Sequence, residues 1–521
     1  MDKLKLIITD RTNWGRFVFC TVFIIMCWAY DLNNTFFVRP QSIHIWRQTN
    51  SLSIALNYFD HNNSLFQPQL HNQFCGDGTS GKSAGEFPII YYSVAKLWKI
   101  FGVHEWIFRL VQLIIIFIGL FSLFELSKHF LKNQLMAGFV ALILFTSPML
   151  VFYGINFLPD GPSLAMMFTG WYFVLRHHLT RKNHQLWIAA FFFAIAVMIK
   201  ITSAFSLIAF VLWLFYEWTL IPKEKRIFNY QIKQVLPFIA IVTISFAWYR
   251  YVEYYNFLNQ GEFSFHGIWP IWRLTANEWI GIKAAVSDIF FKEYMNPYLQ
   301  YLTVLLWLFM LTRFRKNSRI LNWMLILLPM GALSVLLLWF QVLNAHDYYL
   351  IIMLLVIPFV WLSIFSVFND TRWINHPILL VGLSLIFIYN IHTCQKQLSN
   401  RYQGWMNDGF VNHYSALCEI EPLLEQLKIE KNDRVISIPD PSITASLYYM
   451  NRPGFTDFGT DFNKEEQFRK RINQGAKYMI INDTTIIDRP IVKAFAQHLL
   501  GQYRNVKIFD LRPYFVEQSS K

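Results

Sequence analysis

The stretch that decides the fold is IFRLVQLIIIFIGLFSLFELS, residues 107–127. Its length and apolar character are those of a helix that crosses a lipid bilayer. Similar apolar runs recur along the 521-residue chain, in which 55% of the residues are hydrophobic and only 15% are charged. Soluble proteins of this size rarely have so apolar a composition. The sequence therefore predicts a mainly α-helical, polytopic membrane protein.

The apolar runs predict eleven transmembrane helices and their direction. Lys and Arg concentrate in alternate loops, as in Arg181-Lys182 and Arg313-Phe-Arg315, and such loops face the cytoplasm. We therefore expect a protein of the cell (inner or plasma) membrane with a cytoplasmic N-terminus and an extracytoplasmic C-terminus. The same clustering explains the net charge of +13 without nucleic-acid binding. The predicted helices are 17–37, 107–127, 134–156, 162–178, 186–200, 203–220, 235–252, 298–312, 319–343, 348–368 and 375–393.

The last part of the chain changes character and predicts a second domain. It is more charged, and short apolar segments alternate with segments of helical pattern. The predicted strands are Arg434–Ile438, Tyr478–Asn482 and Val506–Leu511, and helices are expected near 416–428, 464–474 and 490–502. This order indicates a small α/β domain. We expect a membrane domain at 1–397 and an extracytoplasmic domain at 398–521.

Residues 76–83, Gly-Asp-Gly-Thr-Ser-Gly-Lys-Ser, fit the nucleotide-binding pattern G-x-x-x-x-G-K-[ST]. That motif works only between a buried strand and a helix whose amide groups hold the phosphates. Here no strand pattern precedes the segment, and Gly85 and Pro88 follow it, which oppose a long helix. We interpret the segment as a polar loop on the outer face.

Polar and ionisable residues gather at the predicted outer ends of the helices. An ionisable group at such a depth is costly unless it is paired or lines a cavity. Alone, Asp160 is equally well explained as a helix cap and Lys200 as a lysine reaching the interface. Four clusters on one face instead favour a functional site. They are His44 to Asn50 with Gly85-Glu86-Phe87-Pro88 in the first outer loop, Pro159-Asp160 in the next outer loop, Lys200 at the end of a span, and Asn344-Ala-His346-Asp347-Tyr348-Tyr349.

The order of these motifs resembles the GT-C glycosyltransferases. The matching elements are His44-Ile-Trp-Arg47-Gln48, Glu86-Phe87-Pro88 in the first outer loop, Pro159-Asp160 and the late His346-Asp347-Tyr348-Tyr349. Within that class they are similar to the branch of protein mannosyltransferases and lipid A aminoarabinose transferases. The resemblance covers about 38–350 and extends only loosely to the tail.

The resemblance implies transfer of a sugar from a polyprenyl-phosphate carrier to a lipid, glycan or protein acceptor on the outer face. Many relatives carry an Asp after the first span, where this chain has Asn50, which cannot accept a proton. The general base is then Glu86, Asp160 or His44, or the chain is catalytically unusual. Arg47 and Lys200 lie on the correct side to bind the donor phosphate.

Two further expectations concern substrate and metal. The residues His346, Asp347, Tyr348 and Tyr349 are expected to contact substrate. The aminoarabinose branch also implies a divalent metal at Glu86, with His266 and His346 as its other ligands, and no other cofactor.

Two other classes of function remain open from the sequence. A transporter or flippase would place polar groups near the bilayer midplane and show internal repeats, whereas here the clusters lie at the outer rim and no repeat is visible. A catalytically inactive relative remains an alternative because of Asn50.

Overall fold

The structure is a computed structural model that describes residues 11–228, 232–261, 267–369, 371 and 376–515. Its chain forms two compact units, each described by itself. The first comprises Met1–Phe37, Phe108–Trp248 and His266–Ser399, and the second Val38–Ile107, Tyr249–Phe265 and Asn400–Lys521. The predicted boundary between residues 397 and 398 stays a prediction, although the second unit combines residues of the predicted tail domain with Val38–Ile107.

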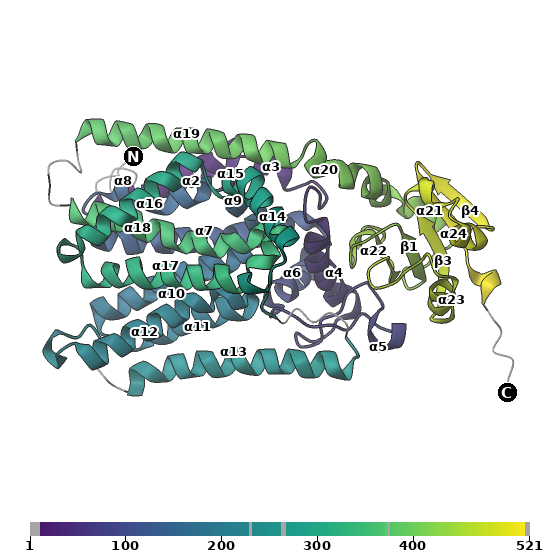
Figure 1. Cartoon of the computed structure of the whole chain (residues 1–521), viewed down its shortest axis with the longest axis horizontal. Coiled ribbons are helices and arrows are strands. Elements are labelled where there is room, and N and C mark those ends of the chain that lie inside the picture. Colours follow the sequence, from purple (N-terminus) through teal and green to yellow (C-terminus); the bar gives the residue numbers. More distant parts are fainter. Residues whose placement is uncertain (1–10, 229–231, 262–266, 370, 372–375, 516–521) are drawn as a thin grey trace. The chain divides into compact units, whose positions relative to one another are not determined.

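The first unit is built from helices. α10 packs along α11, α12 along α17, and α18 against both α16 and α17 (Figure 1). Three of its helices also include residues of the second unit: α7 at its start, and α13 and α19 at their ends. The helices are α2 (Arg11–Ala29), α3 (Leu32–Thr35), α7 (Glu105–Phe130), α8 (Gln134–Leu142), α9 (Pro148–Ile155), α10 (Asp160–Thr180), α11 (His184–Ile199), α12 (Ala204–Leu220), α13 (Ile232–Leu258), α14 (Ala276–Ala285), α15 (Phe291–Tyr294), α16 (Pro297–Thr312), α17 (Arg319–Leu338), α18 (Val356–Val367) and α19 (Pro377–Arg401).

Helices lie at all eleven predicted transmembrane positions. Within the described residues, six helices are long and apolar enough to cross a membrane, and a bent pair makes a seventh. The pair is Gln134–Thr146 and Pro148–Ile155, which meet at 72°, so the segment predicted as the span 134–156 is not one straight helix. The break falls at Pro148, which has no N–H to continue the helix, and the Ser147 hydroxyl accepts a hydrogen bond from Leu150 N instead. The number of crossings and their direction stay predictions.

The second unit contains a five-stranded mixed sheet. The strands are β1 (Arg434–Ile438), β2 (Gly454–Phe455), β3 (Ala476–Ile481), β4 (Leu499–Tyr503) and β5 (Val506–Asp510), in the order β2-β1-β3-β5-β4. β1 is parallel to both β2 and β3, and β5 is antiparallel to β3 and β4. The helices are α4 (Ile45–His61), α5 (Cys75–Gly78), α6 (Ile89–Phe101), α20 (Trp405–Gly409), α21 (Glu421–Gln426), α22 (Ala445–Met450), α23 (Glu465–Asn473) and α24 (Pro490–Phe495). The predicted α/β fold is confirmed.

The predicted helix 490–502 is wrong in its second half. α24 ends at Phe495, and Leu499–Tyr503 forms β4. Tyr503 pairs with Val506 across the two-residue turn Arg504-Asn505, in which Arg504 takes a left-handed φ of 51°. Pairing with β5 therefore overrides the local helical pattern. The two-residue strand β2 is too short to recognise in the sequence.

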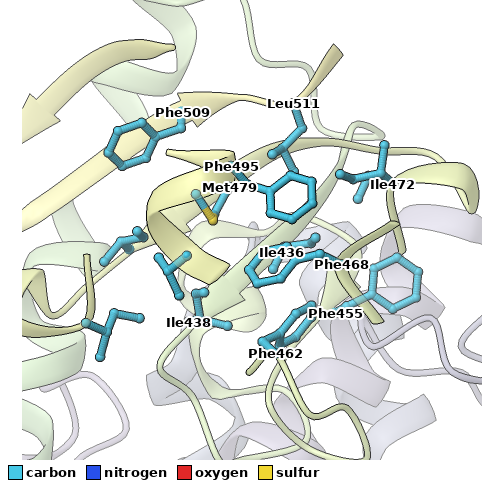
Figure 2. Packing of buried hydrophobic residues seen from close by; sticks show 14 of the residues in the cluster. Ile436, Ile438, Phe455, Phe462, Phe468, Ile472, Met479, Phe495, Phe509 and Leu511 are labelled. Atoms are coloured by element: carbon cyan, nitrogen blue, oxygen red, sulfur yellow. The ribbon is translucent and has the colours of Figure 1, made fainter. Parts of the chain in front are cut away.

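The sheet and its helices enclose an apolar core (Figure 2). The labelled side chains come from β1, β2, β3, β5, α23 and α24 and from the segments beside them. Leu70, Phe74 and Cys75, which lie in the segment between α4 and α6, belong to the same core. Asn72 also forms a parallel bridge with Gly454, so this loop extends the sheet at its β2 edge. The tail therefore does not enclose its core with its own residues alone.

The nucleotide-binding look-alike at 76–83 lies in this loop and is part of a hairpin. Isolated bridges join Gln69 to Lys82 and Cys75 to Ser80, and α6 begins only at Ile89. Arg434 donates hydrogen bonds to Gly78 O at 3.3 Å and to Thr79 O at 2.9 Å. The segment has neither the preceding strand nor the directly following helix of a phosphate-binding loop. Here the segment packs against the sheet, which it contacts through Arg434 of β1.

We expect Lys82→Ala to change activity little. The Lys82 side chain is exposed and stands in a hairpin that lacks the phosphate-binding geometry. The measurement is sugar transfer by the purified full chain, with ATP binding assayed in parallel. Loss of transfer together with ATP binding by the wild type would contradict this interpretation.

Two carboxyl groups of the second unit, Asp440 and Asp457, lie just after the carboxyl ends of β1 and β2. Asp440 is fully buried and accepts hydrogen bonds from Tyr414 OH at 2.8 Å and Ser446 Oγ at 2.6 Å. Its backbone N–H donates to Asp457 Oδ2 at 2.6 Å. Burial, with the nearby Asp440 charge as a lesser cause, raises the pKa of Asp457 from 3.8 to about 6.

This raised pKa predicts a pH dependence of stability. The folded chain binds the Asp457 proton more tightly than the unfolded chain, so the free energy of unfolding falls as the pH rises from about 4 to about 6. The loss attributable to this group is about 1–3 kcal/mol. Thermal unfolding of the full chain between pH 4 and 8 measures it, and Asp457→Asn should flatten the profile. The exposed Asp488→Asn is the control, and an equal flattening there would refute the assignment.

Candidate functional site

In the first unit, Asp160 and Lys200 form a buried ion pair. Asp160 is the first residue of α10, where a negative charge is favoured by the helix dipole. Lys200 follows the last residue of α11, and these two helices form an antiparallel pair joined by a short loop (Figure 1). The start of α10 and the end of α11 are therefore neighbours. Lys200 Nζ lies 2.8 Å from Asp160 Oδ1, and the side chains are 7% and 0% exposed.

The predicted late motif surrounds this pair. Tyr348 and Tyr349 belong to a 3-10 helix, Asp347–Leu355. Lys200 Nζ lies 3.9 Å from the centre of the Tyr349 ring and 5.2 Å from that of Tyr348, distances at which a cation is attracted to an aromatic face. The ring of the partly buried His346 lies 5.4 Å from that of Tyr348. The structure thus brings Asp160, Lys200, His346 and both tyrosines together.

Asp347 lies in the same motif but is fully buried. Tyr153 OH donates to its Oδ1 at 2.5 Å, and the Tyr153 ring packs edge-on against Tyr348. This contact ties the motif to α9. Tyr153 was not identified from the sequence, because a tyrosine in an apolar run is indistinguishable from a core residue.

In the second unit, Arg47 and Glu86 form the other pair. Arg47 lies in α4, and α4 packs against α6, which begins three residues after Glu86. Arg47 Nη2 donates to Glu86 Oε1 at 2.5 Å and also bonds Oε2. Tyr91 OH donates to Glu86 Oε2 at 3.3 Å. The Arg47 and Glu86 side chains are 18% and 25% exposed, so this pair is open to other molecules whereas Asp160 is not.

The remaining predicted residues have different surroundings. His44 precedes α4 in a left-handed conformation with φ 58°, and its side chain does not cap the helix. Asn50 is 6% exposed and accepts a hydrogen bond from Thr444 Oγ1 at 2.7 Å, which links α4 to the tail. His266 lies outside the described residues.

The predicted metal site does not fit the described residues. Within them, no group of three or more His, Cys, Asp or Glu side chains is placed to hold a metal ion. Both Glu86 oxygens accept hydrogen bonds from Arg47, so a metal ion there would have to displace a guanidinium.

Comparison with known proteins gives a family match and similar folds. Residues 85–249 match the family model of dolichyl-phosphate-mannose-protein mannosyltransferase. No curated protein matches the chain.

Solved structures match nearly the whole chain. ArnT from Cupriavidus metallidurans in the apo state is 13% identical, with a TM-score of 0.59 over 96% of this chain and 98% of ArnT. The structure of that ArnT bound to undecaprenyl phosphate gives 11% identity and a TM-score of 0.58, over 98% and 99%.

The Archaeoglobus fulgidus oligosaccharyltransferase in the apo form is 12% identical, with a TM-score of 0.58 over 94% of this chain and 73% of that one. The same enzyme was also crystallised with Zn and sulfate. The chain is therefore a multi-span membrane protein with the GT-C glycosyltransferase fold, which confirms the predicted resemblance to the protein mannosyltransferase and aminoarabinose transferase group.

Proposed function

We propose that this chain is a membrane glycosyltransferase that moves a sugar from a polyprenyl-phosphate donor to a lipid, glycan or protein acceptor on the outer face of the cell membrane. The observation that supports it best is that both predicted phosphate-binding cations are held by the two predicted catalytic carboxylates. The undecaprenyl phosphate bound to ArnT, which shares the fold, supports the class of donor.

The Lys200 ammonium suits the donor phosphate. Displacement of a lipid phosphate leaves a negative charge that a fixed cation stabilises. Lys200 is held by Asp160 and by the faces of Tyr348 and Tyr349, so its position is set before the donor arrives. Because Asp160 is fully buried, we assign it to orienting Lys200 rather than to direct contact with the acceptor.

Glu86 is the better candidate for general base. A base must come within hydrogen-bonding distance of the proton that it removes, and a quarter of the Glu86 side chain is exposed. Arg47 offers the planar donor fork that binds phosphate well. A substrate anion that takes over Arg47 would release Glu86 oxygens to accept the proton of the acceptor hydroxyl, and Tyr91 would still hold the carboxylate.

The proposal is tested by transfer from a panel of radiolabelled sugars on polyprenyl phosphate, using the purified full chain in liposomes. We expect transfer for at least one donor. Lys200→Ala should raise the donor KM by about 10- to 100-fold, as expected for loss of one charge-assisted bond, whereas the exposed Lys82→Ala is the matched control. No transfer with any donor, combined with movement of the labelled lipid across the bilayer, would favour the flippase alternative. No transfer and no movement would favour an inactive relative.

A further inference from the structure

The turn before Asp160 has a strained backbone. It runs from Asn156 to Pro159 between α9 and α10. Phe157 takes a φ of 70°, in the left-handed region that side-chain-bearing residues rarely adopt. Its side chain is fully buried. Such a conformation persists only where neighbouring groups enforce it.

Gln112 of α7 enforces it with one side chain. Its Nε2 donates to Leu158 O at 2.7 Å, and its Oε1 accepts from Phe157 N at 2.8 Å. Gln112 is itself fully buried. A single amide therefore holds two consecutive residues of the turn that ends on Pro159-Asp160. Proline also fixes its own φ, which removes one further backbone rotation between Leu158 and Asp160.

Arg109, one helical turn before Gln112, holds the other end of the turn. Its Nε donates to Asn156 Oδ1 at 3.2 Å, and its guanidinium lies 4.6 Å from the centre of the Phe157 ring. Arg109 is 1% exposed. Two polar side chains inside an apolar helix are costly, and such residues are usually kept for function. Here Arg109 and Gln112 both form hydrogen bonds to residues of the same turn, 156–159.

We propose that Gln112 is a positioning residue that acts through this turn on Asp160, and through Asp160 on Lys200. A buried ion pair is favourable only when its geometry is good, and the 2.8 Å contact between Asp160 and Lys200 depends on where α10 begins. The expected effect of Gln112 on binding of the lipid phosphate rests on the proposed function. The positioning of Asp160 by Gln112 does not.

The first test is a double-mutant cycle in thermal unfolding of the full chain. Gln112→Met keeps the side-chain volume and removes both hydrogen bonds, and Asp160→Asn removes the charge. If Gln112 sets the geometry of the pair, Asp160→Asn should lower the Tm less in the Gln112→Met protein than in the wild type. Gln234→Met, which removes a buried glutamine of α13, is the matched control and should be additive with Asp160→Asn. Additivity of Gln112→Met would overturn the proposal.

The second test separates positioning from loss of structure. Binding of undecaprenyl phosphate and of uncharged undecaprenol is measured for each variant, because only the first lipid has a phosphate that Lys200 can bind. Gln112→Met and Asp160→Asn should each lower the preference for the phosphate lipid by about tenfold, with no further loss in the double variant. Equal weakening of both lipids by Gln112→Met would mean a structural role alone and would overturn the proposal. An unchanged preference in Lys200→Ala would instead remove the phosphate site of the proposed function, and the unfolding cycle would still decide the role of Gln112.

Discussion

Glu86→Gln is expected to lower the rate of sugar transfer by about 10²–10⁴-fold, the usual loss when a general base is removed. Glutamine keeps the size of the side chain and one oxygen for Arg47, but it cannot take a proton at neutral pH. Binding of undecaprenyl phosphate should change much less than the rate. The measurement is the transfer rate at saturating donor, with binding of the lipid as the second readout.

Glu105→Gln is the matched control for this prediction. Glu105 also lies in the second unit and pairs with an arginine, Arg39, at 3.3 Å. It also accepts a hydrogen bond from a tyrosine, Tyr448 OH, at 2.7 Å. Folded Glu105→Gln protein should keep its transfer rate within a few fold. If Glu86→Gln turned over at a normal rate, the assignment of the base to Glu86 would be wrong.

Phe74→Ala is expected to destabilise the tail by about 3–5 kcal/mol, as for other buried phenylalanines. Phe74 is 3% exposed, and its ring packs against Phe455 and lies 4.6 Å from the Arg471 guanidinium. The mutation leaves a cavity in a core that the tail shares with the segment between α4 and α6. The measurement is denaturant unfolding of the full chain, followed by protease sensitivity of 400–515.

Phe66→Ala is the control for this change, because Phe66 belongs to the same loop but is 52% exposed. It should cost less than about 1 kcal/mol. The isolated segment 398–521, which lacks Leu70, Phe74 and Cys75, should fold poorly. A cooperative unfolding transition of that segment, equal to the one in the full chain, would show that the loop is not part of its core.

The local signals in the sequence were sufficient for the class of fold. Apolar runs such as 107–127 indicate segments that are buried in lipid or in a core, and the helix α7 includes the whole of that run. β1 begins and ends where the apolar pattern of Arg434–Ile438 predicts. The bend at Pro148 and the strand β4 were missed. The run around Pro148 is apolar throughout, so its composition does not show where the missing proline N–H breaks the helix. At β4 the local sequence favours a helix, but pairing with β5 makes it a strand.

The sequence by itself determined that this is a helical membrane protein with a small α/β part, and it singled out Arg47, Glu86, Asp160 and Lys200 as charged groups in apolar surroundings. Only the tertiary structure decided their partners. Asp160 meets Lys200 because an antiparallel helix pair brings the start of α10 to the end of α11, and Arg47 meets Glu86 because α4 packs on α6. Composition and periodicity report how deeply a residue is buried, but ion-pair energy depends on a distance of a few ångströms, which packing between distant segments sets.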